Sequence, residues 1–153
     1  MVELELYNLL IQLNYKISFC ESCTGGMLAS TLINVSGSSK VIDESYVTYA
    51  SSSKIKILGV KKETIKKYTV YSKEVAKEMV LGLNQLTNAE VCVSVTGLAE
   101  SETNSCKCDY GILVNGNLHL ESVIFTGSRN EVRKLQTEHI LKRISSILKG
   151  YIV

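Results

Sequence analysis

Apolar residues recur at helical spacing at both ends of the chain. Near the N-terminus, residues 2–13 carry one apolar stripe made of Val2, Leu6, Leu9, Leu10 and Leu13. Residues 130–148 show the same spacing through Val132, Leu135, Ile140, Leu141, Ile144 and Leu148. Positions three or four apart share one face of a helix. We therefore predict helices in both segments, the second with the pattern of a helix that packs on a sheet.

Three shorter helices are predicted between these two. The first runs from Met27 to about Asn34, and the second covers residues 54–58 between a serine run and Gly59. The third opens at Ser72 and continues to about Leu86. Serine before an apolar-periodic run and glycine after it are typical helix limits, because each satisfies backbone groups that the helix leaves unpaired.

Segments rich in β-prone residues lie between the helices, at 16–20, 40–49, 90–95, 110–114 and 118–125. The last two flank Asn115-Gly116-Asn117, which is typical of a hairpin turn. Strands that alternate with helices form parallel sheets covered on both faces, and a hairpin adds antiparallel pairing. The sequence predicts one domain over residues 1–153, an α/β fold that is a three-layer α/β/α sandwich around a mixed β-sheet.

Composition narrows the function classes. A chain of 153 residues with 45% hydrophobic residues can bury a substantial core without metal or disulfide support. The net charge of +2 is too small to indicate nucleic-acid binding. Lysines cluster locally at Lys54, Lys56, Lys61, Lys62, Lys66 and Lys67. A solvated helix face is the simplest interpretation of this cluster, and a rim that attracts anionic substrates is the alternative.

The sequence also indicates a cellular compartment. It contains five cysteines, an odd number, and neither a signal peptide nor a long apolar segment. Odd cysteine counts without secretion signals are typical of reduced thiols. We therefore expect a cytoplasmic protein that does not enter a membrane.

The most informative segment is Glu21-Ser22-Cys23-Thr24-Gly25-Gly26, which joins a predicted strand to a predicted helix. The first N–H groups of a helix lack intrahelical partners, and the helix dipole makes this end partly positive. Such a turn can hold a phosphate or stabilise the oxyanion formed when a nucleophile attacks a carbonyl. Ser22 is either a helix cap, its simplest role, or a nucleophile. Cys23 is a second nucleophile candidate.

A nucleophilic serine needs a base, because its hydroxyl is not ionised at neutral pH. His119 falls in a predicted hairpin strand and His139 in the last helix, where both are more easily structural. A lysine can serve where burial or nearby cations lower its pKa. Lys54 is the best candidate, because Tyr49 lies five residues before it and its phenol could relay a proton or hold the lysine.

Two other chemistries compete for the cysteines. Cys20-Glu21-Ser22-Cys23 is a C-x-x-C motif between a strand and a helix, the position of redox dithiols. Cys20 is more simply a core residue at the end of its strand, because thioredoxin-like motifs are accompanied by a proline-bearing loop and this chain contains no proline. Cys106 and Cys108 could supply metal ligands, but C-x-C spacing is unfavourable for zinc. We expect no metal and no cofactor.

At this point the motifs resemble a known family, the CinA C-terminal domain family, whose enzymatic members are nicotinamide-nucleotide amidases. The serine turn resembles the family's E-S-C-T-G-G motif. Four further segments resemble family motifs in the same order: Val47-Thr48-Tyr49 with Lys54 to Val60, Ser72 to Met79, Val95 to Ala99, and Arg129 to Arg133. Together these matches cover nearly the whole chain.

The resemblance implies a homodimeric α/β/α amidase of the cytoplasm that converts nicotinamide mononucleotide, or a related pyridine nucleotide amide, to the carboxylate and ammonia. Ser22 would be the nucleophile, Lys54 the base and Tyr49 an assisting group. The implied substrate-binding residues are Thr24, Gly25 and Gly26 at the helix start, together with Thr96, Gly97 and Arg129.

The chain departs from the family pattern after residue 99. The family has a glycine-rich loop here, whereas this chain has Glu100-Ser101-Glu102-Thr103-Asn104-Ser105-Cys106-Lys107-Cys108. Glycine-rich loops let backbone amides surround an anion, and the two glutamates would repel a phosphate if they faced the site. Two alternatives follow: a weak or inactive family member that binds a nucleotide or a protein partner, and an amidase for a different small amide.

Overall fold

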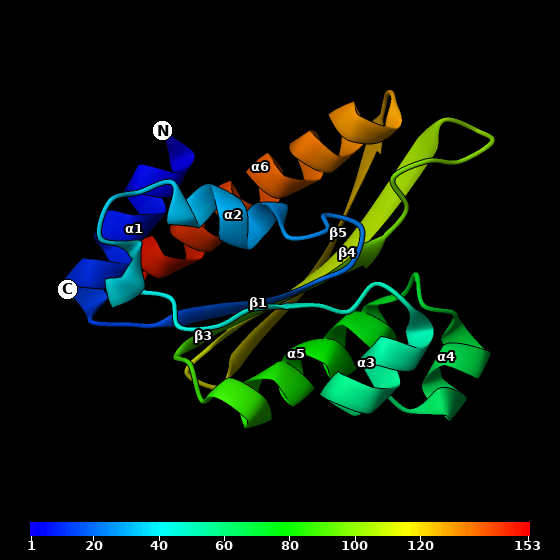
Figure 1. Ribbon diagram of the computed structural model, residues 1–153, viewed down its shortest axis with the longest axis horizontal. Helices are drawn as coiled ribbons and strands as arrows, with labels where there is room; N and C mark the ends of the chain where they lie inside the picture. The colour runs from blue at the N-terminus through cyan, green and yellow to red at the C-terminus, as the bar shows by residue number, and fades with distance from the viewer.

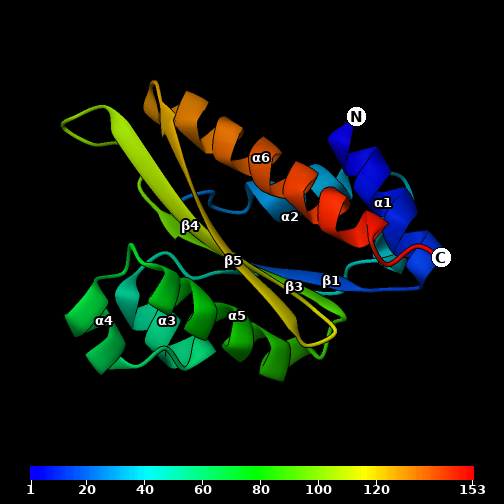
Figure 2. The same ribbon diagram turned by 180° about the vertical axis from the view of Figure 1, so that it is seen from behind.

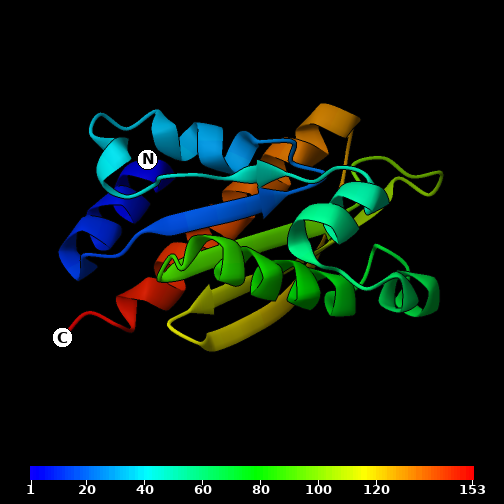
Figure 3. The ribbon, with the colours of Figure 1, turned by 60° about the horizontal axis from the view of Figure 1, so that its bottom comes forward.

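The computed structural model describes residues 1–153. Its centre is a five-stranded sheet in the order β2-β1-β3-β4-β5. The strands β2 (Tyr46–Val47), β1 (Ile17–Glu21) and β3 (Val91–Gly97) are parallel. The strands β4 (Ser105–Val114) and β5 (Asn117–Thr126) pair antiparallel to β3 and to each other. The predicted mixed sheet is confirmed (Figure 3).

Helices cover both faces of this sheet. One layer contains α1 (Val2–Leu13), α2 (Met27–Ile33) and α6 (Arg129–Lys149), and the other contains α3 (Ser51–Leu58), α4 (Lys62–Tyr68) and α5 (Lys73–Thr87) (Figures 1 and 2). A 3-10 turn, Ser38–Lys40, follows α2. The three-layer α/β/α sandwich is therefore confirmed. None of the helices combines the length and the apolar character that a membrane span needs.

Two hydrophobic cores lie on the two faces of the sheet. The larger includes Phe19 with residues of α1, α2 and α6, and the smaller includes Cys20 with residues of α5. Neighbouring residues of one strand point to opposite faces, which is why Phe19 and Cys20 belong to different cores. All of β1 is buried, since helices cover it on both sides.

The strand predicted over residues 40–49 is wrong for most of its length. Only Tyr46–Val47 forms a strand beside β1, with one isolated bridge between Ile17 and Ile42. Polar side chains replace the missing ladder bonds: the Ser18 hydroxyl donates to the Glu44 carbonyl, and the Ser45 hydroxyl accepts from the Phe19 N–H.

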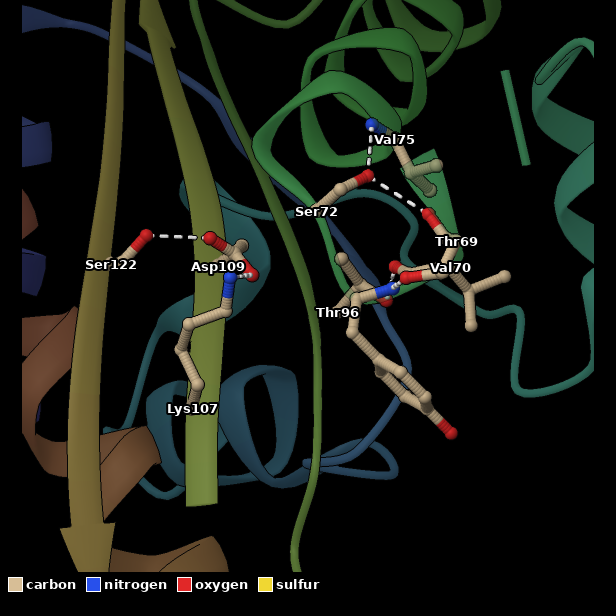
Figure 4. A network of polar contacts seen from close by, with 9 residues as sticks. Thr69, Val70, Ser72, Val75, Thr96, Lys107, Asp109 and Ser122 are labelled. Carbon is tan, nitrogen blue, oxygen red and sulfur yellow. Dashed lines mark hydrogen bonds and ion pairs between the residues drawn. The ribbon is translucent and has the colours of Figure 1, made fainter. Parts of the chain in front are cut away.

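The helix α4 has no counterpart in the prediction. It buries no residue, so its sequence carries no apolar stripe from which a helix could be predicted. The cap predicted at Ser72 is confirmed, because the Ser72 hydroxyl accepts a hydrogen bond from the Val75 N–H at 3.2 Å (Figure 4). This cap fixes the start of α5.

We expect that replacement of Gly82 lowers the stability of the fold, because α5 packs closely against α3 at this residue. A Cβ atom at this position would lie 1.9 Å from the Leu58 carbonyl oxygen, inside backbone that cannot yield. Within an isolated helix, Gly→Ala stabilises by about 1 kcal/mol. Here we expect Gly82→Ala to destabilise by about 1–3 kcal/mol through overpacking. Urea unfolding measures the effect, with exposed Gln85→Ala on the same helix as control; a Gly82→Ala variant more stable than wild type would contradict this packing.

Candidate active site

The carboxyl ends of β1 and β3 open into a cavity of about 510 Å³. Its lining includes Ser22 and Lys54 at its base, Thr96 and Gly97 at the end of β3, and Tyr49 and Arg129. The ends of neighbouring parallel strands in open α/β sheets commonly form ligand crevices. Six of the nine predicted site residues thus line one cavity, although they come from four separate segments of the chain.

Lys54 is buried in the first turn of α3, with only 2% of its surface exposed. Its ammonium nitrogen lies 3.0 Å from the Ser22 hydroxyl oxygen, 2.7 Å from the Thr48 carbonyl oxygen and 3.0 Å from the Tyr49 carbonyl oxygen. The extended backbone just before α3 supplies both carbonyls. Lys54 is therefore held in place by main-chain atoms and aimed at Ser22.

These three contacts determine what a neutral Lys54 can do. A neutral amine has two N–H donors and one lone pair, and carbonyl oxygens can only accept. Both N–H bonds are therefore directed to Thr48 and Tyr49, and the lone pair remains for Ser22. The Ser22 hydroxyl then donates to the Lys54 nitrogen, which is the arrangement that a general base needs.

Burial favours this neutral form. Desolvation lowers the pKa of Lys54 from its ordinary value of 10.5, while negative charge on the nearby thiols of Cys23 and Cys20 opposes the shift. No carboxylate forms an ion pair with Lys54. Desolvated lysines without a counter-ion are the ones that act as bases.

The phenol of Tyr49 does not contact Lys54. Its hydroxyl oxygen accepts a hydrogen bond from Arg129 at 3.0 Å, at the outer part of the cavity. Tyr49 is 60% exposed, and its contribution to Lys54 is its backbone carbonyl. The expected phenolic proton relay is therefore absent from this geometry. Tyr49 instead contacts Lys54 through its carbonyl oxygen and Arg129, at the outer edge of the cavity, through its hydroxyl.

Thr24, Gly25 and Gly26 lie outside the cavity lining. The buried carboxylate of Glu21 already occupies the start of α2: it accepts from the Thr24 hydroxyl and from the N–H groups of Gly26, Leu28 and Ala29. The expected substrate anion site at this helix start is thus filled by the protein's own carboxylate. Sequence reasoning missed Glu21, although an acidic residue before a helix start is a recognisable signal for such a cap.

A second missed residue, Arg133 of α6, holds the serine turn from the other side. Its guanidinium donates to the Cys23 carbonyl at 2.9 Å and to the Thr24 carbonyl at 3.1 Å. A Cβ atom on Gly25, which has φ +59°, would lie 2.8 Å from this guanidinium. The first glycine of the pair therefore leaves room for Arg133 rather than for a ligand.

Thr96 and Gly97 lie at the cavity, but the fold already uses both. The Thr96 hydroxyl donates to the Val70 carbonyl at 2.8 Å, which ties β3 to the segment before α5 (Figure 4). A Cβ atom on Gly97 would lie 2.7 Å from the Cys108 Cα atom in the paired strand. Gly97 thus permits close strand pairing at the cavity wall.

The cysteines separate into different environments. Cys20 packs in the core beside α5, whereas Cys23 packs in the opposite core beside Cys108. The interpretation of Cys20-x-x-Cys23 as a dithiol is therefore wrong, since the sheet lies between the two thiols. The nearby Cys108 thiol lowers the pKa of Cys23, although burial opposes this shift. Cys23 is 5% exposed and is one of the residues that line the cavity.

At the rim, Arg129 joins two residues of other segments. One of its guanidinium nitrogens lies 3.2 Å from a Glu100 carboxylate oxygen, and another donates to the Tyr49 hydroxyl. Arg129 begins α6, and Glu100 follows β3. The loop that departs from the family pattern thus places its first acidic residue against the only exposed cation of the cavity lining.

Comparison with known proteins agrees with this architecture. Residues 1–148 match the model of the CinA C-terminal domain. A CinA-like protein of Petrotoga mobilis is 41% identical over 141 residues, which cover 89% of this chain and 35% of that protein. The chain therefore spans about a third of the length of this relative.

Solved structures give the same result. A competence/damage inducible protein from Agrobacterium tumefaciens superposes with a TM-score of 0.83 at 28% identity, covering 97% of this chain and 95% of that one. A competence damage-inducible protein from Klebsiella pneumoniae has a TM-score of 0.90 at 23% identity, covering 99% and 97% respectively, and supports the fold. This chain therefore belongs to the CinA C-terminal domain family.

Proposed function

We propose that this protein is a serine amidohydrolase in which Ser22 is the nucleophile and Lys54 the general base. One observation carries the proposal. The two N–H groups of neutral Lys54 are directed to carbonyl oxygens, so its nitrogen lone pair faces the Ser22 hydroxyl oxygen, 3.0 Å away. The substrate class that the family implies is a pyridine carboxamide, with nicotinamide mononucleotide or a related nucleotide as the reference compound.

The proposed reaction uses these two side chains in turn. Lys54 accepts the Ser22 proton while the serine oxygen attacks the carboxamide carbon, which gives a tetrahedral intermediate. The Lys54 ammonium then donates its proton to the departing nitrogen, so that ammonia leaves and an acyl ester remains on Ser22. Water hydrolyses this ester with Lys54 again as the base, which releases the carboxylate.

The test is ammonia release from nicotinamide mononucleotide and from its dephosphorylated form, the riboside. We expect turnover of at least one compound by the wild-type protein and none above background by Ser22→Ala. Background-level ammonia from both compounds with the wild-type protein would contradict the proposal. Tight calorimetric binding without turnover would then favour the alternative, a non-catalytic binding protein, which the altered 100–110 loop motivates.

Cys23 is expected to be dispensable for this chemistry. Its thiol packs beside Cys108 in the core, whereas the Lys54 nitrogen is hydrogen-bonded to Ser22. We predict that Cys23→Ala keeps ammonia release within about threefold of wild type and loses about 1 kcal/mol of stability, because it removes a small buried side chain. Turnover assays and thermal unfolding measure the two effects. Loss of turnover in folded Cys23→Ala, with Ser22→Ala still active, would identify the thiol as the nucleophile.

A further inference from the structure

The lining of the proposed amidase cavity contains few charged residues. Among its lining residues only Lys54 and Arg129 are cationic, and only Glu100 is acidic. Lys54 lies at the buried base, where its nitrogen is fully used by Ser22 and two carbonyls. Arg129 is therefore the one cation that an anionic group of a substrate could meet, and Glu100 already neutralises it at 3.2 Å.

The backbone on both sides of Glu100 is anchored, so this pairing does not depend on a loose loop. Two residues earlier, the Leu98 N–H donates to the Lys107 carbonyl and the Leu98 carbonyl accepts from buried Gln136 of α6. One residue later, the Ser101 hydroxyl donates to the Ser105 carbonyl, which closes the loop on itself. Ala99, between them, is buried. These bonds fix the backbone from which the exposed Glu100 side chain reaches Arg129 at the start of α6.

A phosphorylated substrate would meet this carboxylate. A phosphomonoester carries about −1.5 to −2 charges at pH 7, since its second pKa is about 6. A phosphate that binds Arg129 would lie close to the Glu100 carboxylate, which is paired with the same guanidinium, and like charges side by side disfavour binding. The same carboxylate would attract a positively charged ring. The exposed phenols of Tyr49 and Tyr71 at the cavity offer flat surfaces to such a cation.

We infer that Glu100 is a specificity-determining residue that makes this protein prefer an amide without a phosphate, specifically a cationic pyridinium carboxamide at the nucleoside level, over the corresponding nucleotide. This inference rests on the proposed amidase function for its catalytic consequence. The charge argument itself concerns binding, so it can be tested apart from turnover.

The experiment compares nicotinamide riboside with nicotinamide mononucleotide, which differ only by the phosphate. We expect the wild-type kcat/KM to be at least about tenfold higher for the riboside. Glu100→Gln keeps the shape of the side chain and removes its charge. It is expected to raise kcat/KM for the mononucleotide about tenfold, equivalent to about 1.4 kcal/mol, and to leave or lower the value for the riboside. The matched control is Glu102→Gln, in the same exposed loop but outside the cavity lining.

Binding by calorimetry in the Ser22→Ala background separates the two proposals. There, Glu100→Gln should strengthen binding of the mononucleotide, and the effect should shrink at high salt because surface charges are screened. A wild-type preference for the mononucleotide that Glu100→Gln leaves unchanged would overturn the inference, while Ser22-dependent ammonia release would keep the amidase proposal. Absence of turnover together with the predicted binding shift would reject the amidase function and retain the role of Glu100. An equal response to Glu102→Gln would also overturn the inference.

Discussion

Replacement of Ser22 by alanine is expected to lower amide turnover by about 10⁴-fold or more. The variant keeps the cavity but removes the only oxygen nucleophile that is hydrogen-bonded to Lys54. Covalent catalysis cannot then begin, and residual activity would depend on substrate binding and on water alone. Ammonia release in the steady state measures the loss, and mass spectrometry after acid quenching of the wild-type reaction should detect the acyl group on the Ser22 peptide.

The matched control for this variant is Ser30→Ala. Ser30 lies on the exposed side of α2, eight residues after Ser22 and away from the cavity. We expect wild-type turnover from this control, and circular dichroism should show equal folding of both variants. A Ser22→Ala protein that retains more than a tenth of wild-type turnover would eliminate Ser22 as the nucleophile.

Replacement of Lys54 by methionine is expected to have the second largest effect, a loss of about 10²–10⁴-fold in kcat. Methionine fills similar space but cannot accept the Ser22 proton. Since the serine and the lysine act as one unit, the double variant with Ser22→Ala should be no slower than the slower single variant. Lys56→Met, two residues later on the exposed side of α3, is the control for the loss of a positive charge. Wild-type kcat in folded Lys54→Met would refute the role of Lys54.

The pH dependence of turnover provides an independent check on Lys54. Only the neutral amine can accept the serine proton, so kcat/KM should rise with pH and level off above the pKa of Lys54. Burial lowers this pKa from the ordinary 10.5, so the rise should be centred below pH 10.5. An activity that falls as pH increases over this range would contradict a lysine base.

Much of the fold could be predicted because its elements carry local signals. The helices α1 and α6 have complete apolar stripes, and α5 has both a stripe and the Ser72 cap. The hairpin between β4 and β5 follows from Asn115 and Gly116, both of which adopt positive φ. By contrast, α4 has no fully buried residue, and only its partly buried Ile65 packs against the smaller core. The stretch before β2 replaces ladder bonds with side-chain bonds. Neither the helix α4 nor these side-chain bonds leave a mark in the pattern of hydrophobic residues, so neither could be predicted from it.

The candidate site divides in the same way. The Ser22 and Lys54 pair could be proposed from residue types, from motif resemblance and from the need of a serine for a base. The role of the Tyr49 carbonyl could not, since main-chain atoms have no sequence signature. The Glu21 carboxylate occupies the Thr24 hydroxyl and the Gly26 N–H, and this depends on a side chain folding back onto the helix that follows it.

The sequence by itself therefore determined the order of strands and helices apart from α4 and the stretch before β2, the family, and the presence of a serine and a lysine able to perform chemistry. Hydrophobic periodicity and helix limits are local properties, and a single chain expresses them in order. Only the tertiary structure decided which way each polar atom points: Lys54 toward Ser22, Arg133 under the serine turn, and Arg129 against Glu100. Hydrogen bonds and ion pairs form over a few ångströms and between segments up to 110 residues apart, so the packing of the three layers determines them.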